Sequence, residues 1–214
     1  MIKYTFTAIL LFVCLLINGQ DIPVPAGYII LDEKVGDLDK DSIPEKVIVF
    51  DTNDSTDDGT IREIRIYKKV GEKWVVFTSS RNAIGKSQDG GMMGDPFESI
   101  EIIKGLLIVH QSGGSSWKWS DTDKYRFQNG IFQLIGYENH YGKPCEYFQS
   151  IDFNIQTGKI IYKKEFDHCE DEEQENNRNE TETFYKKGIK IDLSNRKLNQ
   201  IKIITPKYKA EIYL

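Results

Sequence analysis

Short runs of β-branched and aromatic residues, separated by turn residues, are the feature that most constrains the fold of this chain. Apolar residues seldom recur at the 3.6-residue period of an amphipathic helix, so strands are favoured over helices. Several runs are joined by tight turns at Val70-Gly71, Lys104-Gly105 and Asn129-Gly130. Asn-Gly is the strongest of these hairpin signals, because both residues accept a positive φ. Strands joined in this way predict an antiparallel meander and an all-β fold.

We expect about twelve strands in a single domain, arranged as a curved sheet, a sandwich or a partial propeller. The predicted strands are Tyr28–Leu31, Lys46–Phe50, Ile61–Lys68, Trp74–Phe77, Ser99–Ile103, Leu106–His110, Tyr125–Gln128, Phe132–Tyr137, Glu146–Phe153, Ile160–Phe166, Glu182–Lys187 and Ile201–Ile204.

Three longer stretches are expected to interrupt the meander. Asp51–Thr60 is acidic, and Ser79–Pro96 is rich in glycine. Residues 167–181 form an acidic, polar run that cannot bury apolar surface, which predicts a mobile, solvated loop.

Residues 1–20 have the layout of a secretory signal peptide. Lys3 precedes an apolar run from about Phe6 to Ile17, and small and polar residues follow it. This run is shorter than the roughly 20 residues of a membrane span. We therefore expect residues 21–214 to be exported, either to the periplasm or to the cell surface and medium, with no stable membrane span after cleavage. An uncleaved anchor and a lipid anchor on Cys14 are the alternatives.

The charge of the chain is acidic. It has 28 Lys and Arg against 33 Asp and Glu, and removal of the segment that contains Lys3 makes the balance more negative. A surface of this sign repels phosphate backbones, so nucleic acid is not an expected partner.

Two cysteines remain beyond the signal segment, Cys145 and Cys169. They flank a predicted hairpin whose turn is "NIQTGK", and a turn centred near Thr157 would place Cys145 opposite Cys169. An exported protein can form disulfides, so we predict this bridge. Two free thiols are the alternative.

The stretch "GDLDKDSIPEK" is the strongest candidate for a metal site. Asp37, Asp39 and Asp41 recur at every second position, Glu45 follows four residues later, and Ile43 can offer its backbone carbonyl. Calcium takes six to eight oxygen ligands in irregular geometry, which such a loop can supply. We therefore predict calcium as a cofactor. An acidic turn that aids solubility is the alternative.

This stretch, with the strand "KVIVFD" after it, resembles the calcium loop of FG-GAP and VCBS repeats, which lies between strands of a β-propeller blade. The resemblance covers about residues 35–51 and implies Asp37, Asp39, Asp41 and Glu45 as ligands. The chain differs from the family pattern at Ser42, where glycine is usual, and at Glu45, where aspartate is usual. Much of the remaining sequence resembles small exported proteins of bacteria of the Bacteroides–Flavobacterium kind.

Trp117, Trp119, Met92 and Met93 are the candidate partner-binding residues. The tryptophans lie two apart, so on a strand both rings face one side, where they could stack on a sugar or grip a peptide. Gly113 and Gly114 beside them would let a partner approach closely. Packing of these four side chains in the core is the alternative.

Catalytic patterns are weak. Ser112, Ser115 and Ser116 lie near His110 but lack the Gly-x-Ser-x-Gly pattern of a nucleophile elbow. We therefore expect an exported, calcium-stabilised, β-rich interaction module of the bacterial envelope that binds a protein or a glycan. A periplasmic hydrolase that uses His110 or His140 is the alternative.

Overall fold

Thirteen β-strands and one short 3-10 helix make up the regular structure of the described residues. The structure is a computed structural model that describes residues 22–167, 169 and 178–214. The predicted signal peptide and most of the predicted acidic loop lie outside this range. The elements are β1 (Ile29–Gly36), β2 (Glu45–Thr56), β3 (Gly59–Val70), β4 (Lys73–Ser80), η1 (Gly91–Met93), β5 (Phe97–Ile103), β6 (Leu106–Gly114), β7 (Lys118–Gln128), β8 (Ile131–Lys143), β9 (Tyr147–Asn154), β10 (Lys159–Phe166), β11 (Glu180–Tyr185), β12 (Lys202–Ile204) and β13 (Glu211–Tyr213).

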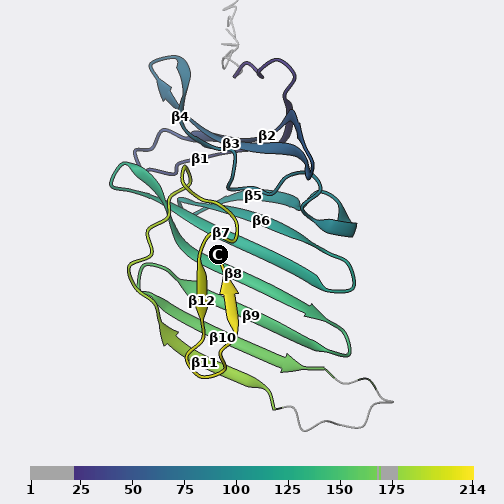
Figure 1. The fold of residues 1–214 in the computed structure, drawn as a ribbon. Helices are drawn as coiled ribbons and strands as arrows, with labels where there is room; N and C mark the ends of the chain where they lie inside the picture. Colours follow the sequence, from purple (N-terminus) through teal and green to yellow (C-terminus); the bar gives the residue numbers. More distant parts are fainter. Residues whose placement is uncertain (1–21, 168, 170–177) are drawn as a thin grey trace, which may run out of the picture.

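The strands form two antiparallel meanders and a small hairpin, as Figure 1 shows. Strands β1 to β4 make a four-stranded sheet in chain order, and β5 to β11 make a seven-stranded sheet in chain order. The hairpin of β12 and β13 lies across one face of the seven-stranded sheet. The prediction of an all-β, single-domain meander is confirmed. Within the described ranges, no helix is long and apolar enough to cross a membrane.

Each predicted strand has a counterpart, and two differences are informative. Strand β13, which pairs with β12 as a small hairpin, has no counterpart among the predicted strands. The predicted interruption at Asp51–Thr60 is wrong, because β2 and β3 continue through it and pair Ser55 with Thr60. This exposed arm of the hairpin is held by backbone pairing, which does not require apolar side chains.

The two sheets meet where β1 lies beside β5. The Asp32 Oδ2 atom accepts a hydrogen bond of 3.0 Å from the backbone N–H of Ile100. Gly36 allows the close approach, since a Cβ atom there would lie 2.7 Å from the Ile102 Cγ2 atom. This joint lets one continuous core run beneath both sheets.

The core lies on one face of the seven-stranded sheet and extends into the four-stranded sheet. Alternation along the strands builds it: in β6, every second residue from Leu107 to Gly113 is buried, while the residues between them face the other side. The C-terminal segment covers this face with Ile191, Leu193, Ile203, Ile212 and Leu214. The opposite face of the large sheet has no such cover among the described residues.

A buried ion pair fixes the C-terminal segment to the sheet. Arg196 and Asp123 are 1% and 2% exposed. The Arg196 Nε and Nη2 atoms donate to the two Asp123 carboxylate oxygens, at 2.8 and 3.2 Å. The Tyr125 hydroxyl donates to Asp123 Oδ2 at 2.8 Å, and Arg196 Nη1 donates to the Lys197 carbonyl at 2.8 Å. The pair is therefore satisfied on both sides, as a buried pair must be.

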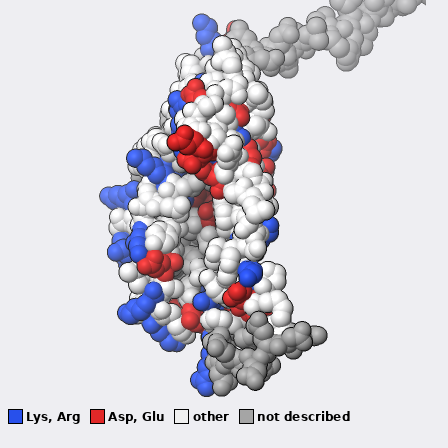
Figure 2. Space-filling view, turned by 45° about the vertical axis from the view of Figure 1, so that its right-hand side comes forward, with Lys and Arg blue, Asp and Glu red and all other residues white. Residues whose placement is uncertain are grey.

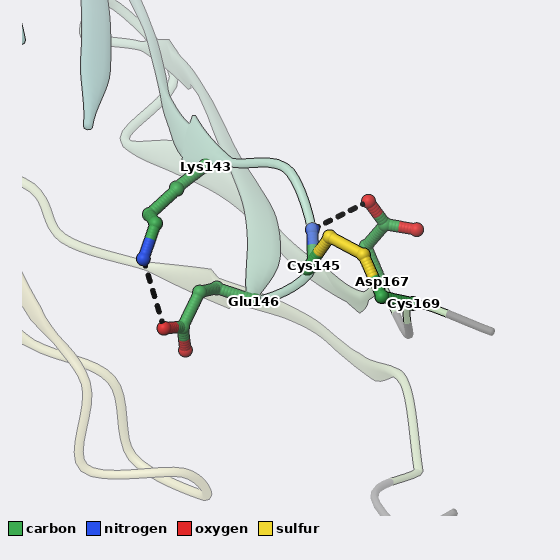
Figure 3. Close-up of a disulfide and its surroundings, with 5 residues drawn as sticks. All are labelled: Lys143, Cys145, Glu146, Asp167 and Cys169. Carbon is green, nitrogen blue, oxygen red and sulfur yellow. Dashed lines mark hydrogen bonds and ion pairs between the residues drawn. A yellow bond between two sulfur atoms is a disulfide. The ribbon is translucent and has the colours of Figure 1, made fainter. Parts of the chain in front are cut away.

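Cys145 and Cys169 form the predicted disulfide, shown in Figure 3, with Cα atoms 5.0 Å apart. The hairpin register differs by one residue from the predicted one, because Tyr147 pairs with Phe166 instead of Asp167. The Asp167 N–H donates to the Glu146 carbonyl at 3.0 Å, and its Oδ2 atom accepts a hydrogen bond from the Cys145 N–H at 3.0 Å. The bridge joins the β8–β9 turn to the end of β10.

We predict that Arg196→Met destabilises the protein strongly. It leaves the Asp123 carboxylate buried without its partner, which costs about 3–5 kcal/mol of the free energy of unfolding. Denaturant unfolding measures the loss. The double variant Asp123→Leu with Arg196→Met removes both charges and is expected to recover part of it. A single variant as stable as the wild type would contradict this role of the pair.

Candidate functional site: an acidic loop and an aromatic cleft

Three of the four predicted carboxylate ligands converge in the loop between β1 and β2. Asp37, Asp39 and Glu45 each offer an oxygen, and these oxygens lie within 4.8 Å of one another. Glu45 is the first residue of β2 and is 2% exposed, so the strand anchors it firmly. Asp41 does not belong to this triad, and both Asp41 and Ile43 are exposed.

Backbone N–H groups of the loop donate hydrogen bonds to the carboxylates of Asp37 and Glu45. Asp37 accepts from Lys40 at 2.6 Å and from Ser42 at 3.1 Å. Glu45 Oε2 accepts from Leu38 at 2.8 Å and from Asp39 at 3.3 Å. Ser42, where the resembling loops usually have glycine, has a φ of 69°. A left-handed conformation costs a non-glycine residue about 1–2 kcal/mol, which the loop must offset.

A lysine from β3 reaches the triad. The Lys68 ammonium forms an ion pair with Asp39 and lies 4.7 and 4.9 Å from the ring centres of Phe77 and Phe127. Burial alone would raise the pKa of Asp39, but hydrogen bonds from Lys68 and the Asp41 N–H lower it. Burial raises the pKa of Glu45, and the neighbouring Asp39 charge adds to the rise. The loop is thus partly neutralised by a cation of the protein itself.

The two tryptophans lie at the other end of the molecule, where β6 turns into β7. The Trp117 ring stacks on Tyr141, with ring centres 5.1 Å apart and planes at 8°, and also contacts Tyr147 at 4.8 Å. Trp119 stands opposite Tyr141 in the β7–β8 pairing. Both tryptophans are half-buried, so their exposure is lower than an open binding face would give and higher than a packed core would give.

The part of the protein that closely approaches Gly113 is its own chain and not an external partner. A Cβ atom on Gly113 would lie 2.7 Å from both the Trp119 ring and the Gly90 Cα. The Gly114 N–H donates to the Gly90 carbonyl at 2.9 Å. These glycines therefore let the Trp119 ring and the loop of η1 pack on β6, so the space expected for an external partner is filled.

The same contacts bring the predicted methionines beside the tryptophans. Met92 and Met93 lie in η1, and Met92 is 88% exposed. The Lys118 ammonium, next to both tryptophans in the sequence, lies 3.5 Å from the Met93 sulfur. Two separate predictions thus fall on one end of the large sheet.

A cleft of about 780 Å³ opens between this end of the sheet and the C-terminal segment. Figure 2 shows a hollow on this side, with acidic side chains along part of it. Two rows on β7, β8 and β9 form its floor: Trp119, Tyr141 and Gln149 in one, Asp121, Asn139 and Ile151 in the other. The walls include Lys86 and Asp89 from the glycine-rich loop and Glu211 and Tyr213 from β13.

Asp121 is the carboxylate on the floor. Its Oδ1 atom accepts from the Tyr137 hydroxyl at 2.8 Å and from the Asn139 amide at 2.7 Å. No hydrogen bond from another described residue reaches its Oδ2 atom, which leaves an oriented acceptor. Burial raises the pKa of Asp121, and the nearby Asp123 adds to the rise, while the bonds from Asn139 and Tyr137 offset only part of it.

The histidines of the hydrolase alternative lie on the other face of the large sheet. His140 stands between Ser120 and Ser150 in the pairing of β7, β8 and β9. The His110 Nδ1 atom lies 3.2 Å from the Thr122 hydroxyl, and its Nε2 atom lies 3.6 Å from Glu101. In the described part of the chain, no hydrogen bond joins either imidazole to a serine. The arrangement therefore lacks the nucleophile–base contact of an acyl-transfer site.

Sequence reasoning missed the floor of the cleft. Asp121, Asn139 and Tyr141 come from two strands and meet only through the β7–β8 register. The alternation in "WKWSDTD" and "YENHY" puts Trp119 and Asp121 on one face, and Asn139 and Tyr141 on one face. It does not show that the two strands pair in this register. No family model, curated protein or solved structure matches the chain.

We predict that Asp121→Asn stabilises the protein at neutral pH. A raised pKa means that the charged carboxylate destabilises the native state relative to the unfolded state. The amide removes this destabilisation while keeping the Oδ1 acceptor. The gain should shrink as the pH falls through the raised pKa and vanish below about 4, where the carboxyl is protonated in both states. Thermal melting at a series of pH values measures it.

Asp152→Asn, on an exposed position of the other face of the sheet, is the matched control and should change the melting temperature little. A variant Asp121→Asn that is less stable than the wild type at neutral pH would contradict the prediction.

Proposed function

We propose that this protein is an exported, calcium-stabilised, β-rich interaction module of the bacterial envelope, which binds a protein or a glycan. The observation that carries the proposal is the cleft of about 780 Å³ between the large sheet and the C-terminal segment. Its volume lies in the range of about 300–1,000 Å³ usual for ligand sites, and it combines aromatic rings with a few oriented polar groups. The export rests on the predicted signal peptide and agrees with the disulfide.

Two further features support a contact surface at this end of the sheet. The exposed Met92 and Met93 lie beside the Trp117 turn, and methionine adapts its shape to a partner more readily than branched side chains do. The disulfide holds the β8–β9 turn, which precedes Tyr147, to the end of β10. A rigid aromatic rim with an adaptable apolar neighbour suits binding better than catalysis.

Calcium would stabilise the opposite end of the molecule. The triad of Asp37, Asp39 and Glu45 offers hard oxygen ligands, and backbone carbonyls and Asp41 can add others as the loop adjusts. An incoming ion competes with Lys68 for Asp39. We therefore propose a site of moderate affinity, suited to an extracellular setting.

We predict that calcium raises the melting temperature. An ion that binds only the native state stabilises it by about 2.7 kcal/mol at a hundredfold excess over Kd. Magnesium should have less effect, since it demands a tighter octahedron. Asp39→Ala should abolish the calcium effect, and Lys68→Met should enlarge it, because the variant has lost the competing cation. Scanning calorimetry in calcium and in chelator measures these shifts.

Asp57→Ala, in the exposed β2–β3 turn, is the matched control and should keep the calcium response of the wild type. If neither the wild type nor Lys68→Met changes its melting temperature between calcium and chelator, the loop is only a charged turn stabilised by Lys68.

We also predict that Trp117→Ala removes binding at a small cost in stability. The ring stacks on Tyr141, and such aromatic pairs contribute about 0.5–1.5 kcal/mol beyond their buried area. Truncation of a core aromatic would cost about 3–5 kcal/mol. The immobilised protein is exposed to the envelope fraction of a bacterium of the Bacteroides–Flavobacterium kind, and retained protein and carbohydrate are both stained.

Two controls separate the possible outcomes. Trp74→Ala, in the small sheet, should lose stability but keep the retained component. His140→Ala should also keep it, since His140 lies on the other face of the sheet, and turnover of generic ester or glycoside substrates that this variant lacks would support the hydrolase alternative. Retention of the same components by wild type and Trp117→Ala would refute a binding role of the tryptophan.

A further inference from the structure

We propose that the ligand of the cleft is a neutral carbohydrate, held with sugar faces against the Trp119–Tyr141 row and hydroxyl groups on the Asp121–Asn139 row. The inference rests on the proposed function and deepens it by choosing between its two partner classes. It follows from the spacing of the two rows, from the free acceptor on Asp121 and from the pairing of the wall charges within the protein.

The floor of the cleft has two aromatic rings in one row beside two polar side chains in the other, and Gln149 and Ile151 end these rows on β9. Trp119 and Asp121 are two residues apart on β7, as are Tyr141 and Asn139 on β8, so the rows lie about 7 Å apart. Neighbouring strands are about 4.8 Å apart, so each row places its side chains at about that interval. A pyranose ring has an apolar face of C–H groups and hydroxyl groups around its rim, and therefore matches such a floor.

The polar side chains of the floor present oriented groups. Tyr137 and Asn139 donate to the Oδ1 atom of Asp121 and so fix the carboxylate plane, leaving Oδ2 as an acceptor for a ligand hydroxyl. Gln149, next to Tyr141 on the floor, adds both a donor and an acceptor. A ligand rich in hydroxyl groups can use all of these together.

The wall charges of the cleft are largely paired within the protein, so a ligand need not bring charges of its own. Asp58 and Glu211 line the cleft, but Lys86 pairs with Asp58 at 2.7 Å and Lys202 with Glu211 at 2.5 Å. The protein thus supplies a cation for these two wall carboxylates, and the third, Asp89, accepts a hydrogen bond from the Lys86 backbone N–H at 2.7 Å. Two cations also lie over rings that line the cleft, Lys164 at 3.9 Å from Tyr147 and Lys202 at 5.6 Å from Tyr213. An added cation would meet two wall carboxylates and two rings that already have a cation of the protein beside them.

The experiment is calorimetric titration of the whole mature protein with a panel of neutral hexasaccharides of glucose, mannose, galactose, xylose and N-acetylglucosamine. We expect at least one to bind, with an affinity that changes less than about twofold between low and high salt. Asp121→Asn should weaken that binding by about tenfold to hundredfold, because it replaces the free acceptor with an amide donor. Asp152→Asn should bind as the wild type does.

Two results would overturn the assignment. No binding of any hexasaccharide at millimolar concentration would refute it, and so would equal binding by wild type and Asp121→Asn. Tri-arginine peptide tests the rival ligand: binding that falls steeply with salt, without sugar binding, would replace the carbohydrate with a basic peptide. In that case the proposed binding function would still hold. That function is refuted separately if the wild type retains no component of the envelope fraction that Trp117→Ala fails to retain.

Discussion

The ion pair between Asp123 and Arg196 is the interaction on which the arrangement of the large sheet depends. A single layer of seven strands buries nothing on its own, and its apolar face needs a cover. The cover here is the C-terminal segment, which has only two strands of three residues each. A buried, bidentate pair gives this segment one position on the sheet, because any shift would leave two charges without partners. Because the C-terminal segment forms one wall of the cleft, the ion pair also fixes the position of that wall.

The acidic loop also depends on pairing a carboxylate with a cation of the protein, but at a less buried position. Asp37, Asp39 and Glu45 would repel one another without a nearby positive charge, and Lys68 supplies one from β3 while its ammonium rests on two phenylalanine rings. A calcium ion would add two positive charges where one is present now. The loop is therefore expected to fold in either condition and to differ in rigidity, which is why its calcium response and its lysine must be tested together.

The strands and the disulfide could be predicted because their determinants are local. Turn residues such as Asn129-Gly130 and alternating apolar residues act over a few positions. Cys145 lies in the β8–β9 turn and Cys169 beyond the end of β10, so their bridge does not depend on the exact register of the paired strands. The cleft could not be predicted, because Asp121 and Asn139 meet only through the β7–β8 register and the wall depends on Arg196, about seventy residues further along the chain. The acidic β2–β3 arm was mistaken for a break because exposed strands need no apolar pattern.

The alternation of β-strands also separates the two functions considered for this protein. On β8, Asn139 lines the cleft while the neighbouring His140 lines a second cavity of about 630 Å³ on the opposite side, and Tyr141 borders both. On β7, Ser120 is separated in the same way from Trp119 and Asp121. A ligand on the cleft floor therefore has the backbone layer between itself and both histidines. Binding in the cleft and imidazole chemistry on the other face would be independent properties, so the loss of one in a variant says nothing against the other, and each needs substitutions on its own face.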